Sequence, residues 1–397
     1  MDLSFLADEI SGLKEKGRYR FLRRLSSPQE PRIVIEGREV LNFSSNNYLG
    51  LANHPEVVAA LVDCARRYGV GSGASRLISG HMDVHAELEE AMGRFKGTEG
   101  CLTFSAGYMA NLGILSTLGS PDATIFSDEW NHASIVDGCR LARARVEVYR
   151  HADVTHLEDL LKASPSRRKI VVTDSVFSMD GDIAPLPDLV TVKDRHGAIL
   201  VVDDAHATGV LPPRGRGSAE HFGLAGRVEI QMGTFSKALG TYGAYLCSTR
   251  KMVDYFINKC RPFIFNTGLP PAIAGATLAS LGLLTREPGR LVALWENGKA
   301  FRREMEARGR KVVSDTAIVP ILVGDDGDTM AVSRALFDRG VFVHGIRPPT
   351  VPEGTGRLRL TLMATHTAEM VRTAAVRIDE ALRERGIGTD GAAAEPG

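Results

Sequence analysis

The sequence has no excess of charge and few cysteines. Its 397 residues carry 48 Lys and Arg against 48 Asp and Glu, so the formal net charge is zero. A nucleic-acid or membrane-surface role driven by bulk charge is therefore not expected, although a local basic patch stays open. The five cysteines stand at positions 64, 101, 139, 247 and 260. This odd number at wide spacings argues against a disulfide framework or a zinc site and favours reduced thiols in the cytoplasm.

Long apolar stretches are also missing. The start of the chain, Met1–Leu6, is soon interrupted by charge and has no secretory core. No run is long enough to span a bilayer, so we expect no membrane association. The G-x-S-x-G motif is absent, which disfavours a serine hydrolase. Hydrophobic residues make up 44% and charged residues 24%, an ordinary globular composition with enough apolar side chains for a large core.

Two stretches resemble known binding motifs but lack a residue that each motif requires. Val70–Arg76 is rich in glycine, but no strand precedes it and the third glycine of the dinucleotide-binding spacing is missing. His81 and His85 have the i, i+4 spacing of a zinc pair, but Met82 stands where the metalloprotease motif needs glutamate. We therefore expect an ordinary helix that carries both histidines, and no metal site.

The order of elements predicts an α/β chain with several parts. The basic run Arg18–Arg24 closes the first helix, either as a solvated face or as a contact for a substrate anion. The first predicted elements are a helix over 4–25, a hairpin at Glu36-Gly37 and a helix over 54–68 capped at Asn53. The central part is predicted to hold strands at 100–104, 123–126, 146–149, 169–174 and 198–203, and a helix over 108–118. A helical region over 272–308, interrupted near 287–289, leads to a last α+β unit with strands near 317, 341 and 357 and helices over 328–339 and 367–385. The expected divisions are an N-terminal segment 1–50, a large domain 51–285, a small domain 286–385 and a disordered tail 386–397.

Strands that are apolar throughout indicate where a ligand binds. Lys169–Asp174 and Ala198–Asp203 are almost continuous apolar runs that end in an acid. Such strands are buried on both faces, as in a parallel sheet covered by helices. Ligands of these sheets bind beyond the carboxyl ends of the strands, where Ser178 and Lys237 also fall.

Lys237 lies in the stretch Gly233–Gly240, with small residues and hydroxyls around it. The glycines allow a sharp turn and a close approach to a ligand. A lysine among apolar and hydroxyl groups can lose its proton near neutral pH and form a Schiff base. A surface lysine in a loop is the alternative.

Three further patterns each have an ordinary alternative. Asp203 could hold a pyridinium nitrogen, with His206 facing the same ligand, or could simply cap the next element. The turn at Gly107, with Tyr108 after it, could offer amides to a phosphate, as many strand-to-helix turns do. His132 could stack on a flat ring or could be a core histidine.

Together these features are those of a pyridoxal 5′-phosphate (PLP) site. The motifs Gly233–Gly240, Val202–His206, Asn42–Leu51 and Ile346–Pro352 resemble those of the α-oxoamine synthases, a family of fold-type I PLP enzymes. The likeness runs from about residue 18 to 385. It implies a PLP-dependent transferase whose large domain has a mostly parallel seven-stranded sheet, with a smaller C-terminal α+β domain.

The resemblance also implies roles for single residues. It implies that Lys237 is the Schiff-base lysine and the base. Around the cofactor ring it implies Asp203 at the pyridine nitrogen, His206 at the ring hydroxyl and His132 stacked on the ring. It places Gly107 and Tyr108 at the phosphate, with Ser178 and Thr234 as further cofactor contacts. Thr267 resembles a residue that reaches the phosphate of a neighbouring subunit, which implies a homodimer with shared sites. The substrate contacts implied are Asn46 and Arg359 for the amino-acid carboxylate, and Arg20 and Thr350 for the acyl group.

The family condenses an amino acid with an acyl thioester and releases CO2. Gly71–Gly80 and Arg261–Pro271 are most similar to the members that join L-alanine to a pimeloyl thioester, with CoA or an acyl-carrier protein as the donor. Members that use glycine or serine are the near alternatives. An aminotransferase or aldolase-like lyase of the same fold and a non-catalytic PLP-binding module are more distant alternatives.

Overall fold

The computed structural model describes residues 3–388 and divides them into two compact units. The larger unit comprises Asn46–Ser178 and Asp182–Val292. The smaller unit comprises the described residues up to Ser45, Met179–Gly181 and those from Ala293 onward. Residues 389–397, most of the expected tail, lie outside the described part of the chain, and the expected domain limits stay a prediction.

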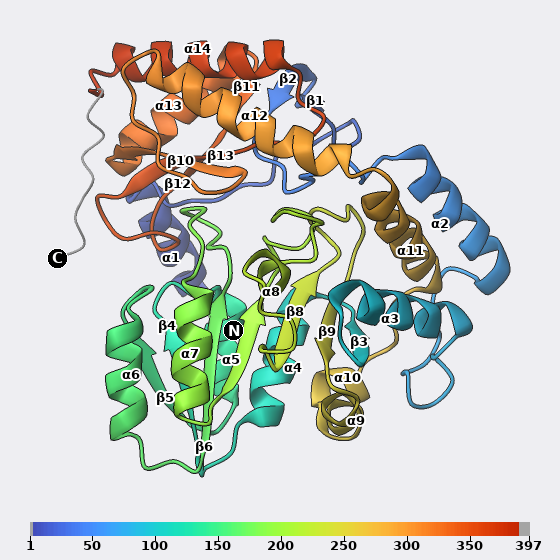
Figure 1. Ribbon diagram of the computed structural model, residues 1–397. Coiled ribbons are helices and arrows are strands. Elements are labelled where there is room, and N and C mark those ends of the chain that lie inside the picture. Colours follow the sequence, from blue (N-terminus) through green and yellow to red (C-terminus); the bar gives the residue numbers. More distant parts are fainter. Residues whose placement is uncertain (1–2, 389–397) are drawn as a thin grey trace. The chain divides into compact units, whose positions relative to one another are not determined.

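The larger unit is built on one seven-stranded sheet (Figure 1). In spatial order its strands are β3 (Gly100–Phe104), β9 (Ala244–Ser248), β8 (Ile230–Thr234), β7 (Ile199–Asp203), β6 (Arg168–Asp174), β4 (Ala123–Asp128) and β5 (Arg145–Tyr149). Only β9 runs antiparallel to its neighbours, so the mostly parallel sheet predicted from the sequence is confirmed.

Both faces of this sheet are covered by helices, as the apolar strands predict. Successive residues of β6 alternate between two clusters: Ile170 and Val172 belong to one, and Val171 to the other. Strand side chains alternate between faces, so the two clusters lie on opposite faces. The helices of this unit are α2 (Pro55–Tyr68), α3 (Asp83–Lys96), α4 (Gly107–Leu118), α5 (Ala133–Leu141), α6 (Val154–Ala163), α7 (Leu186–Arg195), α8 (Ser218–His221), α9 (Arg250–Lys259), α10 (Arg261–Ile264) and α11 (Pro271–Arg286). Helices α4, α5 and α9 pack in the first cluster, and α6 and α7 in the second.

The smaller unit holds two three-stranded sheets, β1-β2-β11 and β10-β13-β12. Its elements are α1 (Ser4–Glu15), β1 (Arg32–Ile35), β2 (Arg38–Asn42), β10 (Ile318–Gly324), α13 (Asp326–Asp338), β11 (Val341–Phe342), β12 (His344–Ile346), β13 (Gly356–Thr361) and α14 (Ala368–Glu384). Helix α12 (Gly289–Glu306) begins in the larger unit and continues into the smaller one. The predicted hairpin is confirmed, since Glu36 and Gly37 both adopt positive φ between β1 and β2. The break near 287–289 is also confirmed, between α11 and α12.

Three local predictions are wrong. The first helix ends at Glu15 rather than near 25, because Gly17 adopts a left-handed φ of 64° and the amides of Gly17 and Arg18 bond back to the last turn. The cap of α2 is His54, whose side chain accepts from the Glu56 amide, and not Asn53. His81 precedes α3, so that helix carries only His85.

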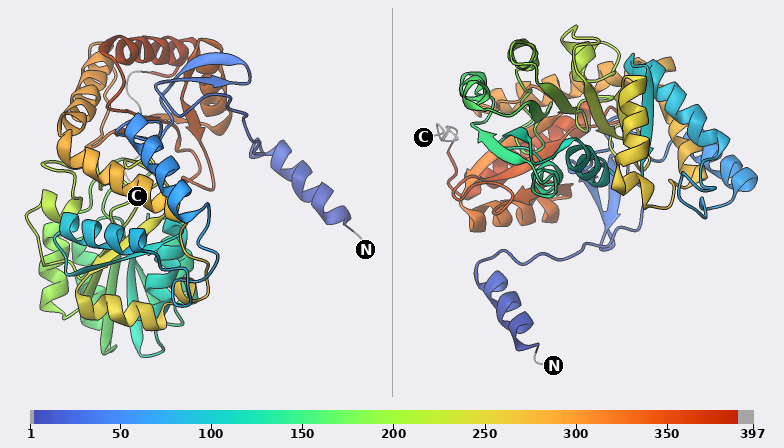
Figure 2. Two further views of the ribbon diagram at one scale, coloured as in Figure 1. Left: turned by 90° about the vertical axis from the view of Figure 1, so that its right-hand side faces the viewer. Right: turned by 90° about the horizontal axis from the view of Figure 1, so that it is seen from below.

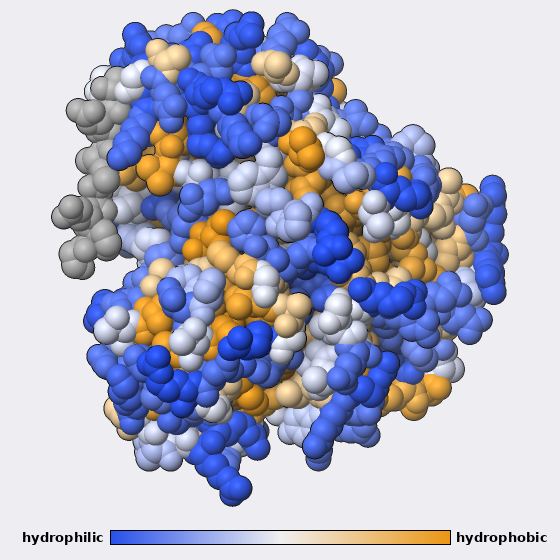
Figure 3. Space-filling view, viewed as in Figure 1, coloured by the Kyte–Doolittle hydropathy of each residue, from blue (hydrophilic) through white to orange (hydrophobic). Residues whose placement is uncertain are grey.

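The surface agrees with this placement of the cores. Figure 3 shows mostly hydrophilic residues on the face that it presents. Helix α1 adds nothing to either core, since none of its residues is buried. Figure 2 shows it standing away from the sheets of its own unit. Among residues 3–388, no helix is both long and apolar enough to cross a bilayer.

Candidate active site

Polar side chains of the larger unit gather at the carboxyl ends of its central strands. Asp174 is the last residue of β6 and lies opposite Asp203, the last residue of β7. Lys237 follows β8 by three residues. Because these strands are parallel, their carboxyl ends share one edge of the sheet, which is where ligands bind in this class of fold.

The loop that carries Lys237 is fixed by its neighbours. Thr234 is buried, and its hydroxyl donates to the Gly243 carbonyl at 2.8 Å and lies 2.8 Å from the Ser236 hydroxyl. Gly240 has a φ of 66°, and a Cβ there would lie 2.4 Å from the Ala52 amide nitrogen. Only glycine therefore fits at that turn. Lys237 itself is half-buried.

Asp203 is buried and is held by two N–H donors. Its Oδ1 accepts from the Ala205 amide and its Oδ2 from Asn111 Nδ2, both at 2.8 Å. Neither donor carries a charge. A buried carboxylate with this surrounding is suited to a cationic ligand group.

Asp204, the next residue, faces a different environment. It forms an ion pair with Lys96 at 2.7 Å, and both side chains are completely buried. The hydroxyls of Ser175 and Ser218 donate to its Oδ1 at 2.7 and 2.6 Å. These contacts satisfy Asp204 within the fold.

His132 is the N-cap residue of α5, and its ring is tied to Asp203 through Ser134 and Asn111. Ser134 Oγ lies 2.7 Å from His132 Nδ1 and accepts from Asn111 Nδ2 at 2.9 Å. Desolvation lowers the pKa of His132, the nearby Asp203 opposes that shift, and the charge of Lys237 adds to it. His132, Asp203 and Lys237 are therefore close enough to influence one another.

Asp174 holds the backbone at His132. Its Oδ2 accepts from the His132 amide at 2.7 Å. Burial raises the pKa of Asp174 well above its usual range, and the charge of Asp203 raises it further. Two neighbouring carboxyl groups in one desolvated site cannot both ionise cheaply. Asp174 is therefore the group of the pair that we expect to carry a proton.

The start of α4 forms a cradle of backbone amides. Its N-cap residue, Ala106, has no side chain able to cap the helix. A Cβ at Gly107 would lie 3.9 Å from Thr234 Oγ1, so that hydroxyl borders the same turn. Asn266 Nδ2 donates to Ser105 Oγ at 2.8 Å, which places the residue before Thr267 beside this turn of the same chain. Uncapped amides and a hydroxyl are suited to a phosphate.

His206 belongs to a second chain of contacts. Its Nδ1 lies 2.8 Å from the hydroxyl of Tyr48, which is completely buried. The Tyr48 hydroxyl in turn lies 3.3 Å from Asn46 Oδ1. A predicted substrate residue and a predicted cofactor residue are thus joined through one tyrosine.

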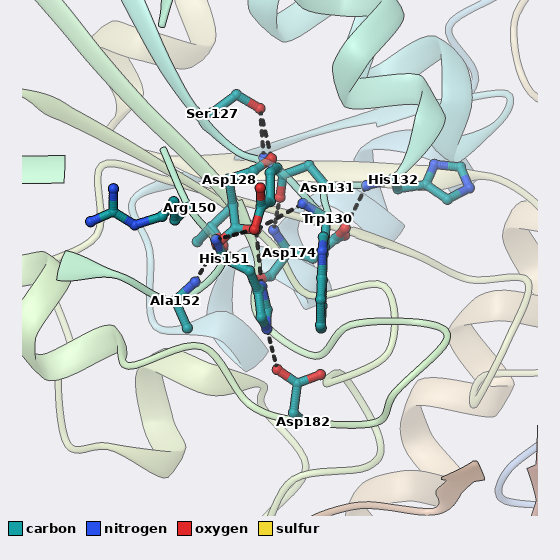
Figure 4. A network of polar contacts seen from close by, with 12 residues as sticks. Ser127, Asp128, Trp130, Asn131, His132, Arg150, His151, Ala152, Asp174 and Asp182 are labelled. Carbon is teal, nitrogen blue, oxygen red and sulfur yellow. Dashed lines mark hydrogen bonds and ion pairs between the residues drawn. The ribbon is translucent and has the colours of Figure 1, made fainter. Parts of the chain in front are cut away.

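A second histidine network lies beside the loop that leads to His132 (Figure 4). The ring of His151 donates to Asp128 at 3.0 Å and to Asp182 at 2.9 Å, and stacks on Trp130 with ring centroids 3.8 Å apart. Burial alone would lower the pKa of His151, but the two carboxylates outweigh it and raise the pKa to about 9. Because carboxylates only accept, the ring carries both protons.

The remaining predicted residues are less closely joined to this group. Ser178 is half-buried, four residues before Asp182. Thr267 is exposed and pairs in a bridge with Ser75. Three belong to the smaller unit: Arg20 and Thr350 are exposed, and Arg359 is buried on β13. No metal-binding group of three or more His, Cys, Asp or Glu occurs among residues 3–388.

Sequence reasoning missed three side chains that hold the site, namely Asn111, Ser134 and Tyr48. Asn111 had one visible signal, since it is a lone amide in the apolar helix Gly107–Leu118. Ser134 follows His132 by two residues, a spacing typical of local capping. Tyr48 lies inside the motif Asn42–Leu51, but nothing in the sequence links it to His206.

Comparison with known proteins decides the family. The family model described as "Aminotransferase class I and II" matches residues 38–378. The chain belongs to this family. Its fold is that of the fold-type I PLP-dependent transferases, as the resemblance to the α-oxoamine synthases implied.

Three similar proteins are informative. The 8-amino-7-oxononanoate synthase of Geobacter sulfurreducens is 50% identical over 96% of this chain and 99% of its own length. The 8-amino-7-oxononanoate synthase of Symbiobacterium thermophilum is 45% identical over 96% of this chain and 98% of its own length. The solved serine palmitoyltransferase from S. paucimobilis, with a bound PLP–myriocin aldimine, is 34% identical and has a TM-score of 0.92 over 98% of this chain and 100% of that one.

Proposed function

We propose that this chain is an 8-amino-7-oxononanoate synthase that condenses L-alanine with a pimeloyl thioester, releasing CO2 and a free thiol, in biotin biosynthesis. The observation that carries this proposal is full-length identity of 45–50% to enzymes of that name. The site supports it, because Lys237, Asp203 and His132 lie together at the strand ends.

The residues fit pyridoxal 5′-phosphate, which we propose as the cofactor. The Lys237 amine would hold it through its aldehyde carbon. The amides at Gly107 and Tyr108, with the Thr234 hydroxyl, would bind its phosphate, and His132 would cover its ring. The Ala205 amide and Asn111 are uncharged donors, so a protonated ring nitrogen would bring a positive charge to this carboxylate. His206 would donate to the ring hydroxyl and Ser178 would add a further contact.

The chemistry is divided between the cofactor and these side chains. When bound, PLP supplies an electron-withdrawing ring that stabilises negative charge at the substrate Cα. The Lys237 amine removes the Cα proton of alanine and returns a proton to the same carbon after CO2 has left. Asp203 keeps the proton on the ring nitrogen. The covering ring of His132 holds the reacting groups in place and excludes water.

Substrate binding is proposed from the resemblance alone. Asn46 and Arg359 would orient the alanine carboxylate, since a guanidinium binds a carboxylate in a fixed fork. Arg20 and Thr350 would contact the acyl group. CoA or an acyl-carrier protein would be the donor. Thr267 would contact the cofactor phosphate of a second copy, in a homodimer with shared sites. We propose a cytoplasmic location, which agrees with five free thiols in the described residues.

A substrate matrix tests the proposal. Purified holoenzyme is assayed for CO2 release with alanine, glycine and serine, each against pimeloyl and palmitoyl thioesters of CoA and pimeloyl-carrier protein. Alanine with a pimeloyl donor should give the highest rate and a product with the mass of 8-amino-7-oxononanoate. The Lys237→Ala protein is the matched blank. The gene should also restore growth without biotin to a strain that lacks this step.

Serine palmitoyl transfer is the second candidate, because the solved serine palmitoyltransferase superposes with a TM-score of 0.92. A close backbone match reports the fold rather than the substrate. The same matrix separates the two, since a preference for serine with palmitoyl-CoA would overturn the first proposal. Amino-group transfer to keto acids without any thioester would overturn both.

A further inference from the structure

Asn111 is a buried amide in the mostly apolar helix α4. It lies on α4, one turn after Gly107, and is 2% exposed. A buried amide is costly unless it is hydrogen-bonded. Asn111 uses both of its N–H groups, one towards Asp203 Oδ2 at 2.8 Å and one towards Ser134 Oγ at 2.9 Å. Because a carboxylate only accepts, the nitrogen of this amide must face Asp203.

The direction of the Asn111 donor leaves the proton of Ser134 available for His132. Ser134 Oγ accepts from Asn111, so its own proton is free to point at His132 Nδ1, which is 2.7 Å away. The Ser134 amide also donates to Nδ1, at 3.2 Å. With two donors directed at it, Nδ1 carries no proton, and the neutral ring of His132 is protonated at Nε2.

The same amide fixes the carboxylate of Asp203. The Ala205 amide holds Oδ1 and Asn111 holds Oδ2, so the plane of the carboxylate is set by one backbone and one side-chain donor. Only the side-chain donor can be removed by mutation. One residue therefore controls two groups that are 71 positions apart in the sequence, Asp203 and, through Ser134, His132.

We propose that Asn111 is a positioning residue that sets the tautomer of His132 and the orientation of Asp203 together through its single amide. This inference rests on the proposed function for its catalytic meaning. Asn111 touches neither substrate nor cofactor in this account. It acts on the ring that covers the cofactor and on the acid that pairs with the cofactor nitrogen.

Two variants separate the two branches. Asn111→Leu has a similar volume and removes both hydrogen bonds, whereas Ser134→Ala removes only the branch to His132. Thr124→Val is the matched control, because Thr124 is also fully buried and hydrogen-bonded to Ser166 but lies at the amino-terminal end of β4.

The tautomer of His132 is the decisive readout. In PLP-loaded protein labelled with [15N]histidine, long-range proton–nitrogen spectra should show His132 protonated at Nε2 in the parent, with the signal assigned by a His132→Gln variant. Ser134→Ala and Asn111→Leu should both shift it towards a mixture of tautomers. Thr124→Val should leave it unchanged. An unchanged His132 spectrum in Ser134→Ala would overturn the proposal even if Asn111→Leu failed to fold.

Cofactor affinity tests the second branch. The dissociation constant for PLP should rise about 10- to 100-fold in Asn111→Leu, the effect of losing a hydrogen bond to a charged group, and much less in Ser134→Ala. A loss of thermal stability with unchanged affinity and tautomer would make Asn111 merely structural. Neither readout needs turnover, so a failure of the substrate matrix would overturn the proposed function and leave this inference intact.

Discussion

Asp203 and Asp204 are neighbours at the end of β7, yet their surroundings differ in the charge of the groups that contact each carboxylate. Asp204 meets a lysine, two hydroxyls and the Ser218 amide, all supplied by the protein. Asp203 meets two uncharged N–H donors. The protein neutralises Asp204 itself, whereas we propose that the charge of Asp203 is left for the cofactor.

The comparison also shows how a strand end produces this difference. Side chains of successive residues point to opposite sides of a strand, so the two acids cannot face the same groups. Asp204 points towards Lys96 of α3, and Asp203 towards Asn111 of α4. Each partner comes from a helix about a hundred residues earlier, which no local pattern reveals.

The largest expected effect is at Lys237, in the loop that follows β8. Lys237→Ala should lower turnover by about 10⁴-fold, because it removes both the covalent link to the cofactor and the base. The purified protein should lose the visible absorbance of bound cofactor, and borohydride should no longer fix cofactor mass to it. Lys251→Ala, at an exposed lysine of α9, is the control. An unchanged spectrum in Lys237→Ala would move the Schiff-base lysine elsewhere.

Asp203→Asn should follow, with turnover lower by about 10²- to 10³-fold, the effect of losing one preorganised charge in an active site. The fold should persist, since asparagine can still accept the Ala205 amide hydrogen bond. Circular dichroism and thermal unfolding check the fold, and proton exchange at the alanine Cα checks the chemistry. If Asp204→Asn reproduced this loss per folded molecule, the two acids would have been assigned the wrong way round.

The sequence predicts the strand ends but not the side chains that connect them. Continuous apolar strands that end in acids are enough to place Asp174 and Asp203 at one edge. Alternation along β7 also shows that only one of the two acids faces the site. Asn111, Ser134 and Tyr48 escape prediction because each contact joins loops or helices from different parts of the chain. The sequence predicts a first helix that is too long, because its charged and apolar pattern continues past Gly17, where the backbone leaves the helix.

Breaking the buried ion pair between Asp204 and Lys96 should lower the stability of the fold rather than the rate of turnover. Asp204→Asn leaves the buried Lys96 ammonium without its counter-ion, which should cost about 3–5 kcal/mol of unfolding free energy. Denaturant unfolding measures this, and turnover per folded molecule should stay close to the parent value. Replacing both partners, with Lys96→Met and Asp204→Leu, should recover much of the loss. Failure to recover any stability would show that the serine hydroxyls, rather than the ion pair, govern this site.

The smallest effect concerns Asp128, an acid that resembles Asp204 but has a titratable partner. The folded pKa of His151, about 9, lies above its ordinary value of 6.5. Its contribution is therefore complete below about pH 6.5 and is lost as the pH rises through about 9. A shift of that size corresponds to at most about 3 kcal/mol of unfolding free energy. Denaturant unfolding between pH 6 and 10 should show this loss in the parent and much less of it in His151→Gln. An equal decline in His151→Gln would show that another group titrates.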